Sequence, residues 1–271
     1  MDSERIVLDR RVTPLGEIQL QQRQTPDGGV ALEIIVNGVF LMASYNRASE
    51  RALAELALQT GATGRRVLVG GLGMGHTLRA VLECESVSWV DVVEVEQAVV
   101  GWNRLYLGDQ SACLDDPRVH VVNADFSLFV ESAGPRYNAI CLDVDNGPLW
   151  LSLESNRTIY HLAGLRRLRE RLADDGVLTV WSAAPAPWFA ARLRRVFGSA
   201  EVVQVPERDP WGREHAALIY RAAKQGVAPG GYGSPVVVTD QVSRHSTAAP
   251  GASVRSSSEK KVRLAPPHIS K

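Results

Sequence analysis

Apolar and polar positions alternate with period two in the first part of the chain. The alternating runs lie at residues 16–20, 31–36 and 39–42. Turn signals separate them, and Asn37-Gly38 in particular is typical of a type I′ hairpin, whose two central residues have positive φ. This pattern predicts a small antiparallel β appendage over residues 1–45.

A helical period begins at Ala48. Its apolar positions are Ala52, Leu53 and Leu56. Glu50 and Glu55 are expected on the opposite, polar face of this amphipathic helix. The helix leads into a second region in which short apolar runs and helical patterns alternate as far as residue 223.

This second region predicts a mostly parallel sheet, because strands that alternate with helices form βαβ units. The strands are expected at residues 67–70, 91–94, 119–122, 138–142, 177–181, 201–205 and 215–221. The helices are expected at residues 76–84, 96–107, 126–132, 158–172 and 187–197, and Gly176 is expected to be the turn residue after helix 158–172. Seven strands indicate a Rossmann-like α/β fold of the class I methyltransferase type, whose last strand is antiparallel.

Residues 224–271 lose this pattern. They contain five prolines, five glycines and no sustained apolar period, which predicts a disordered tail, and Val236 to Thr239 are too few to secure a strand. The tail carries seven Lys or Arg against two acids, which leaves residues 1–223 with 23 basic and 28 acidic residues. The predicted organisation is therefore a β appendage (1–45), a catalytic domain (46–223) and a basic tail (224–271).

Composition narrows the class of protein. A chain of 271 residues with 45% hydrophobic content can bury one substantial core. Nothing in the slightly acidic folded part suggests a nucleic-acid surface, no apolar run is long enough to span a membrane, and no signal-peptide core follows the charged start. Cys84, Cys113 and Cys141 have no paired spacing, which favours free thiols and a cytoplasmic location.

A glycine-rich turn after the first strand of this region indicates a nucleotide pocket. Gly71, Gly73 and Gly75 allow the backbone to approach a ligand closely. The second strand ends at Glu94, about twenty residues downstream, which suits hydrogen bonds to ribose hydroxyls. The spacing is not the Gly-x-Gly-x-x-Gly of dinucleotide sites, so nicotinamide binding is disfavoured.

The third strand ends in an acid beside an aromatic residue. Asp125 suits a hydrogen bond to the exocyclic amine of a base, and Phe126 offers an apolar surface for the flat ring. With the glycine turn and Glu94, they predict a pocket for an S-adenosyl sulfonium compound. The alternative is that Glu94 and Asp125 only cap the helices that follow them.

Asp143 and Asp145 follow the fourth strand, where ligands bind in doubly wound sheets. Asp143 is the candidate catalytic base, because it can hold an amine nucleophile and accept its proton, while Asp145 is expected to orient the acceptor's charge. The alternative is a loop cap that binds backbone amides. Two carboxylates without a third ligand define no metal site, so no metal is expected.

These motifs resemble the spermidine synthase family, the aminopropyltransferases built on the methyltransferase fold. The matching segments are Gly71 to Arg79, Val93 to Val100, Asp116 to Val119, Asn123 to Asp125, Tyr137 to Asp143 and Gly147-Pro148. The resemblance implies that Glu94 binds the ribose, Asp125 the adenine amine and Asp143 the attacking amine. It also implies a homodimer and a donor that is decarboxylated S-adenosylmethionine.

Three features depart from the family pattern. The usual Tyr-His-Glu before the first core strand is missing, and the segment Ala48 to Arg51 offers at most Glu50. Met74 stands where family members usually carry an acid that holds the donor's aminopropyl amine, and the segment from Asp143 to Pro148 is shorter than usual. Three functions therefore remain open. They are aminopropyl transfer to a small-molecule amine, methyl transfer from S-adenosylmethionine itself, and a non-catalytic scaffold that retains the nucleoside pocket.

Overall fold

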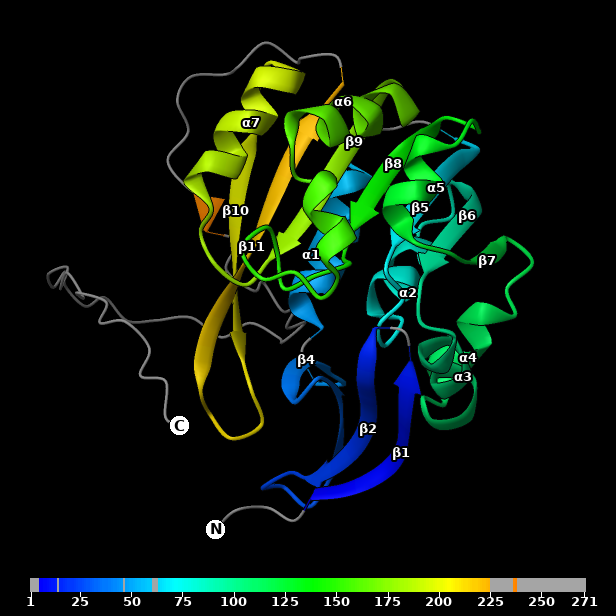
Figure 1. Cartoon of the computed structure of the whole chain (residues 1–271), viewed down its shortest axis with the longest axis vertical. Coiled ribbons are helices and arrows are strands. Elements are labelled where there is room, and N and C mark those ends of the chain that lie inside the picture. Colours follow the sequence, from blue (N-terminus) through cyan, green and yellow to red (C-terminus); the bar gives the residue numbers. More distant parts are fainter. Residues whose placement is uncertain (1–4, 14, 46, 60–62, 225–235, 238–271) are drawn as a thin grey trace, which may run out of the picture. The chain divides into compact units, whose positions relative to one another are not determined.

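The protein is described by a computed structural model that covers residues 5–13, 15–45, 47–59, 63–224 and 236–237. The N-terminal part is a four-stranded antiparallel sheet in the order β1-β2-β3-β4 (Figure 1). Its strands are β1 (Arg5–Thr13), β2 (Gly16–Gln24), β3 (Val30–Val36) and β4 (Val39–Ala43). Asn37 and Gly38 between β3 and β4 have φ of 51° and 77°, which confirms the predicted hairpin turn.

The second sheet has the order β12-β10-β11-β9-β8-β5-β6-β7. Its strands are β5 (Arg65–Gly70), β6 (Val87–Glu94), β7 (Val119–Asn123), β8 (Tyr137–Leu142), β9 (Leu172–Ser182), β10 (Glu201–Arg208), β11 (Glu214–Ala223) and β12 (Val236–Val237). The five strands β5 to β9 are parallel to one another, and β11 is antiparallel to both β9 and β10. The predicted seven strands and the antiparallel last strand are confirmed, and β12 adds a two-residue parallel pairing to β10.

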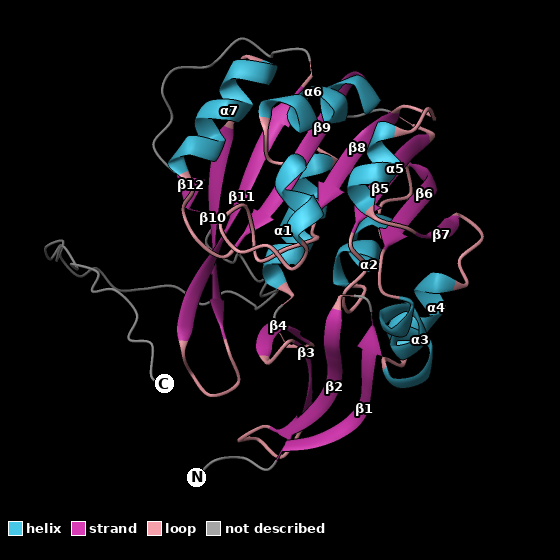
Figure 2. Ribbon diagram, in the orientation of Figure 1, coloured by secondary structure: helices cyan, strands magenta, loops and turns pink. Residues whose placement is uncertain are grey.

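Helices cover both faces of the second sheet (Figure 2). They are α1 (Ala48–Ala57), α2 (His76–Leu82), α3 (Gln97–Tyr106), α4 (Asp109–Leu114), α5 (Phe126–Glu131), the 3-10 helix η1 (Glu154–Thr158), α6 (Leu162–Arg171) and α7 (Pro187–Phe197). One apolar cluster joins α1, α2 and α3 to the sheet, and a second joins α5, α6 and α7 to the opposite face. The strands are buried from both sides, which explains their nearly continuous apolar sequences.

The helix predicted over residues 158–172 is shorter than expected. It starts at Leu162, after η1, and ends at Arg171. The turn residue is Asp175, with φ of 61°, and not Gly176. A Cβ at Gly176 would lie 2.9 Å from the carbonyl oxygen of Ala173 and 3.0 Å from that of Tyr137 on β8, so glycine suits this tightly packed position. The sequence pattern also gave no indication of α4.

The orientation predicted for Glu50 is wrong. Glu50 is 5% exposed and lies on the buried face of α1 with Leu53 and Ala54, whereas Glu55 is exposed as expected. Residues 50, 53, 54 and 57 share one helix face because they are three or four positions apart. The apolar stripe of α1 therefore contains a carboxylate at its N-terminal end.

Most of the predicted basic tail lies outside the described residues. Lys224 belongs to the fold, because its backbone N–H donates to Gly176 and its ammonium donates to the carbonyl of Leu172, at 2.9 and 2.8 Å. None of the described helices is long and apolar enough to cross a membrane.

We predict that a chain ending at Lys224 melts within a few degrees of the full chain. Among the described residues, this truncation removes the two-residue ladder of β12, while Lys224 keeps its two hydrogen bonds to β9. Circular dichroism during heating measures this difference. A fall of more than about 8 °C, roughly 2 to 4 kcal/mol for a domain of this size, would show that β12 is an essential edge of the sheet.

Candidate active site

The glycine turn lies where the parallel strands β5, β6 and β8 end. Gly71 has φ of 84°, its N–H donates to the carbonyl of Val93, and a Cβ at this position would collide with the carbonyl oxygen of Asp143. Gly73 and Gly75 also have positive φ, and Gly75 is the N-cap residue of α2. Gly71 and Gly73 line the central cavity, and Gly75 does not. The turn thus brings the backbones of β5 and β8 together beside the cavity.

Glu94 supports this turn from the end of β6. Its carboxylate accepts hydrogen bonds from the backbone N–H groups of Leu72 and Glu96, each at 2.8 Å. Burial raises the pKa of Glu94 despite these hydrogen bonds. Each oxygen retains a lone pair, and the side chain lines the cavity, so Glu94 can still accept a hydrogen bond from a ligand hydroxyl.

Asp125 and Phe126 differ in their positions. Asp125 caps α5 by accepting from the N–H of Ser127 at 2.7 Å, and its second oxygen accepts from the hydroxyl of Ser155 at 2.7 Å. Burial acts to raise its pKa, but these hydrogen bonds outweigh it and the pKa is lowered. Phe126 lines the cavity together with Ala124, whereas Asp125 does not. Asp125 therefore acts as a helix cap, the alternative stated above, and Phe126 forms an apolar part of the cavity wall.

Asp143 extends from the end of β8 into the cavity. Its carboxylate accepts a hydrogen bond from the hydroxyl of Thr77 on α2 at 2.9 Å. Burial and the neighbouring charge of Glu207 raise the pKa of Asp143 to about 6, although the Thr77 hydrogen bond opposes this. No arginine or lysine among the described residues forms an ion pair with it. Asp143 is therefore a half-buried carboxylate with unused acceptor capacity and a pKa of about 6.

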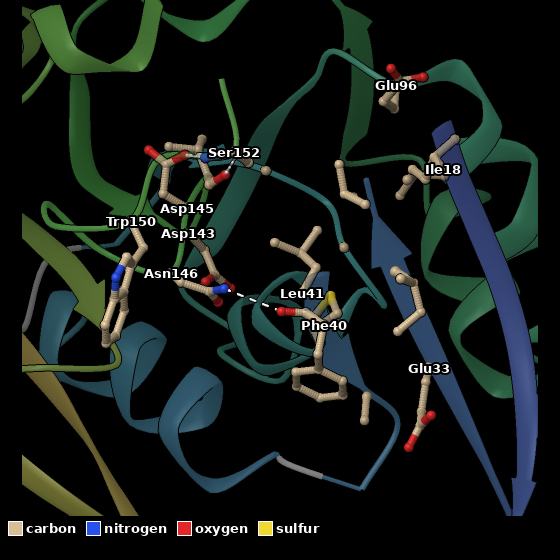
Figure 3. Close-up of a pocket in the computed structure, with 18 of the residues that line it drawn as sticks. Ile18, Glu33, Phe40, Leu41, Glu96, Asp143, Asp145, Asn146, Trp150 and Ser152 are labelled. Atoms are coloured by element: carbon tan, nitrogen blue, oxygen red, sulfur yellow. Dashed lines mark hydrogen bonds between the residues drawn. The ribbon is translucent and has the colours of Figure 1, made fainter. Parts of the chain in front are cut away.

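Asp145 has a different environment two residues later. One oxygen accepts from the backbone and hydroxyl of Ser152 and from Asn156, at 2.6, 2.7 and 3.0 Å. The other accepts from the hydroxyl of Tyr160 at 2.8 Å. Figure 3 shows that Asp145 points toward Ser152, away from the direction of Asp143. Asp145 thus organises the loop between β8 and α6, which corresponds to the loop-cap alternative.

The cavity has a volume of about 1060 Å³ and lies between the four-stranded sheet and the carboxyl ends of the second sheet. Asn146 donates across it to the carbonyl of Phe40 on β4, at 3.4 Å (Figure 3). Nine carboxylates and three arginines line the wall. The acids are Glu17, Glu33, Glu50, Glu94, Glu96, Asp143, Asp145, Glu207 and Asp209. The cavity is large enough for a nucleoside and a second small molecule, and it is strongly acidic.

Glu50 and Glu207 are site residues that the sequence interpretation missed. Glu207 lies on β10, on the same face as Val203 and Val205, and is 8% exposed. An acid in the apolar register of an alternating strand was an available signal, but the strand was predicted to end at 205. Trp150 and Trp181 also line the cavity. Met74, at the position where family members usually carry an acid, is fully buried in the core and does not line the cavity. No acid therefore approaches the cavity from this position.

No cluster of three or more His, Cys, Asp or Glu side chains suited to a metal ion occurs in the part of the chain that the structure describes. The expected absence of a metal stays a prediction.

The sheet order, the antiparallel last strand and the position of the cavity define a class I methyltransferase fold. Two solved structures with this fold are similar, each at 22% identity over 80% of this chain. A spermidine synthase in complex with the transition state analogue AdoDATO has a TM-score of 0.68, and the spermidine synthase from Thermotoga maritima has 0.65. The match covers 73% and 72% of those chains.

Residues 46–193 match the family described as the spermine/spermidine synthase domain, and the chain belongs to this family. A polyamine aminopropyltransferase from Synechococcus sp. is 31% identical over 53% of this chain and 45% of its own length. Polyamine aminopropyltransferase 1 from Streptomyces coelicolor is 35% identical over 54% of this chain and 29% of its own length. The chain thus spans about half or less of the length of these relatives.

We predict that Glu50→Gln stabilises the protein at pH 8 and changes little at pH 4. Burial, with the charges of Asp143 and Glu207, raises the pKa of Glu50 to about 8. Between about pH 4.3 and 8 the folded state keeps a proton that the unfolded state has lost, so the free energy of unfolding decreases as pH rises. The neutral amide removes this loss, which amounts to about 1 to 4 kcal/mol at pH 8.

Denaturant unfolding at several pH values measures this effect. Glu55→Gln, on the exposed face of the same helix, is the matched control and should show the pH dependence of the wild type. Parallel pH curves for wild type and Glu50→Gln would contradict the prediction.

Proposed function

We propose that the protein transfers an aminopropyl group from decarboxylated S-adenosylmethionine to a small-molecule amine. The observation that carries this proposal is the excess of carboxylates around Asp143, at the place where doubly wound sheets bind their ligands. Amine acceptors and the aminopropyl sulfonium donor are cations, so an acidic cavity complements both. The family relationship supports the same reaction class.

In this proposal the nucleoside part of the donor lies along the glycine turn. Gly71 and Gly73 provide a backbone surface without side chains, Glu94 accepts from the ribose hydroxyls and Phe126 packs against the base. Gly75 acts by starting α2, and Asp125 contributes by holding the Ala124 and Phe126 wall in position through its cap of α5. The role of Asp125 toward the adenine amine stays a prediction.

The reaction requires little from the protein beyond position and proton removal. The amine nitrogen attacks the carbon bonded to sulfur, a C–N bond forms, and the C–S electron pair returns to the sulfonium, which leaves as a neutral thioether in methylthioadenosine. The proton released from nitrogen passes to the carboxylate of Asp143. A base whose pKa is about 6 accepts this proton at neutral pH, and alignment of nitrogen, carbon and sulfur supplies most of the rate increase.

Methyl transfer from S-adenosylmethionine is the second candidate, and electrostatics disfavours it. The amino-acid part of S-adenosylmethionine carries a carboxylate, the group that decarboxylation removes. Two of the three arginines at the wall already pair with acids of the protein, because Arg23 faces Glu33 at 3.8 Å and Arg213 binds Asp209 at 2.7 Å. They are therefore poorly placed to bind this carboxylate. A non-catalytic scaffold is disfavoured because carboxylates with raised pKa values, such as Asp143, are typical of reactive sites.

We predict that Asp143→Asn lowers turnover by about 10² to 10⁴ and leaves methylthioadenosine binding nearly unchanged, because the amide keeps the shape and loses the basicity. The assay supplies each donor with a panel of amines and identifies the product by mass spectrometry. Addition of an aminopropyl group supports the proposal, and addition of a methyl group supports the second candidate. In the wild type, kcat/KM should rise through about pH 6 as Asp143 ionises.

Two results would contradict this assignment. Normal turnover by Asp143→Asn would exclude Asp143 as the base. Loss of methylthioadenosine binding in parallel with activity, measured by calorimetry, would show that Asp143 only holds the glycine turn in place.

We further propose that the protein is a cytoplasmic homodimer. Cys84, Cys113 and Cys141 form no disulfide among the described residues, which fits a reducing compartment. On the edge strand β1, Ile6, Val7 and Val12 are 47%, 44% and 86% exposed, and an apolar edge of this kind favours pairing with a second copy. Light scattering on the full chain should give twice the monomer mass at micromolar concentration. A strictly monomeric species would exclude the dimer.

A further inference from the structure

The carboxylates of the cavity differ in how well they are compensated. Several have strong donors within the protein. Glu33 accepts from Gln21 and faces Arg23, Asp209 binds Arg213, Glu94 accepts from two backbone N–H groups, Glu96 accepts from Thr13, and Asp145 has four donors. Asp143, Glu50 and Glu207, like Glu94, Glu96 and Asp145, have no arginine or lysine partner among the described residues. Asp143 accepts from the hydroxyl of Thr77, and Glu50 and Glu207 share the single hydroxyl of Ser49, so these three can accept further hydrogen bonds from a cation that enters the cavity.

Glu50 and Glu207 form a pair through Ser49. The hydroxyl of Ser49 lies 2.9 Å from an oxygen of Glu50 and 3.0 Å from an oxygen of Glu207, and the Ser49 N–H donates to the same Glu207 oxygen at 3.0 Å. One hydroxyl proton serves only one of these carboxylates at a time. The second oxygen of Glu207 lies 3.3 Å from Nε2 of His215, a half-exposed side chain. Two acids are thus held together with fewer donors than they can use.

The chain places this pair by a long-range contact. Residues 49 and 207 are 158 positions apart. They meet because the β10–β11 hairpin extends beyond the end of the neighbouring strand β9 (Figure 1). Its tip reaches the four-stranded sheet, where Trp211 contacts Tyr45 and Arg23. Glu207 lies outside residues 46–193, the segment that matches the family, so the family motifs do not assign it a role.

Asp145 is poorly suited to bind the second ammonium of an acceptor, so another carboxylate is needed for it. A diamine acceptor has a reacting nitrogen, which Asp143 can hold, and a second ammonium that needs an anion of its own. Asp145 was expected to supply this anion, but it already accepts four hydrogen bonds, three at one oxygen and one at the other, so little acceptor capacity remains for an ammonium. Breaking these bonds on binding would leave buried donors unsatisfied, each at a penalty comparable to the new ion pair.

We propose that Glu207, with Glu50, binds the second, non-reacting ammonium of a diamine acceptor and so selects diamines over monoamines. This inference rests on the proposed function. The ammonium replaces the missing donors of the pair and donates to Glu207 and Glu50 at once, while the other end of the acceptor remains beside Asp143. Specificity then resides on β10 and not in the loop that follows β8.

The test measures binding of 1,4-diaminobutane and of n-butylamine to the full chain saturated with methylthioadenosine, by calorimetry. In Glu207→Gln the diamine affinity should fall by about 10- to 100-fold, the range for loss of a charge-assisted hydrogen bond, and the butylamine affinity by less than about twofold. Glu201→Gln removes an exposed acid from the other end of β10 and is the matched control, with both affinities unchanged. Equal losses for both amines, or none, would overturn the proposal.

A second variant keeps the test decisive if Glu207→Gln melts at a lower temperature. Glu207→Asp retains the charge but withdraws it by one methylene, so preference should shift from 1,4-diaminobutane toward 1,5-diaminopentane. A purely structural role for Glu207 predicts no such shift, and its absence would overturn the proposal.

Failure of the proposed function has a different signature. Wild type that binds 1,4-diaminobutane more tightly than butylamine but forms no product with either donor would contradict the transferase and leave the subsite standing. Product formation with unchanged selectivity in both Glu207 variants would contradict the subsite alone.

Discussion

The close approach of β8 to the glycine turn is the contact on which the site depends. The N–H of Asp143 donates to the carbonyl of Gly70 at 2.8 Å, and Gly71 has no side chain where the backbone of Asp143 passes. Any other residue at position 71 would collide with that backbone and would have to adopt a positive φ. This contact sets the position of Asp143 relative to the turn, and therefore the distance between a carboxylate and any ligand along the turn.

The two aspartates after β8 illustrate how hydrogen bonding divides similar residues. Asp145 has four donors and fixes the loop that leads to η1, whereas Asp143 has one side-chain donor, Thr77. Burial raises the pKa of both, but Asp143 has more lone pairs free to hold a substrate amine. The heavily hydrogen-bonded Asp145 provides rigidity, and the sparsely hydrogen-bonded Asp143 provides reactivity. A rigid loop in turn limits how far Asp143 can move from its productive position.

Acidic groups brought together in a buried cavity reduce stability in the absence of a cation. Burial, together with the charges of Asp143 and Glu207, raises the pKa of Glu50 to about 8. Such an arrangement persists where ligand binding restores the balance, because a bound cation stabilises the ionised form of each neighbouring acid. The same repulsion that weakens the empty protein thus favours cationic substrates over neutral or anionic ones.

The sequence alone determined the features that depend on local pattern. Apolar periods predicted the strands β5 to β11, Asn37-Gly38 predicted a turn that only residues tolerant of positive φ can form, and the end of an apolar run placed Asp143 at the edge of the sheet. Tertiary structure decided the rest. The period of α1 could not say that its face toward β9 and β10 would also meet Glu207, 157 residues away from Glu50, and nothing local showed that Ser152, Asn156 and Tyr160 would saturate Asp145. Local pattern reports which side of an element is buried, whereas the partners on that side depend on how distant elements pack.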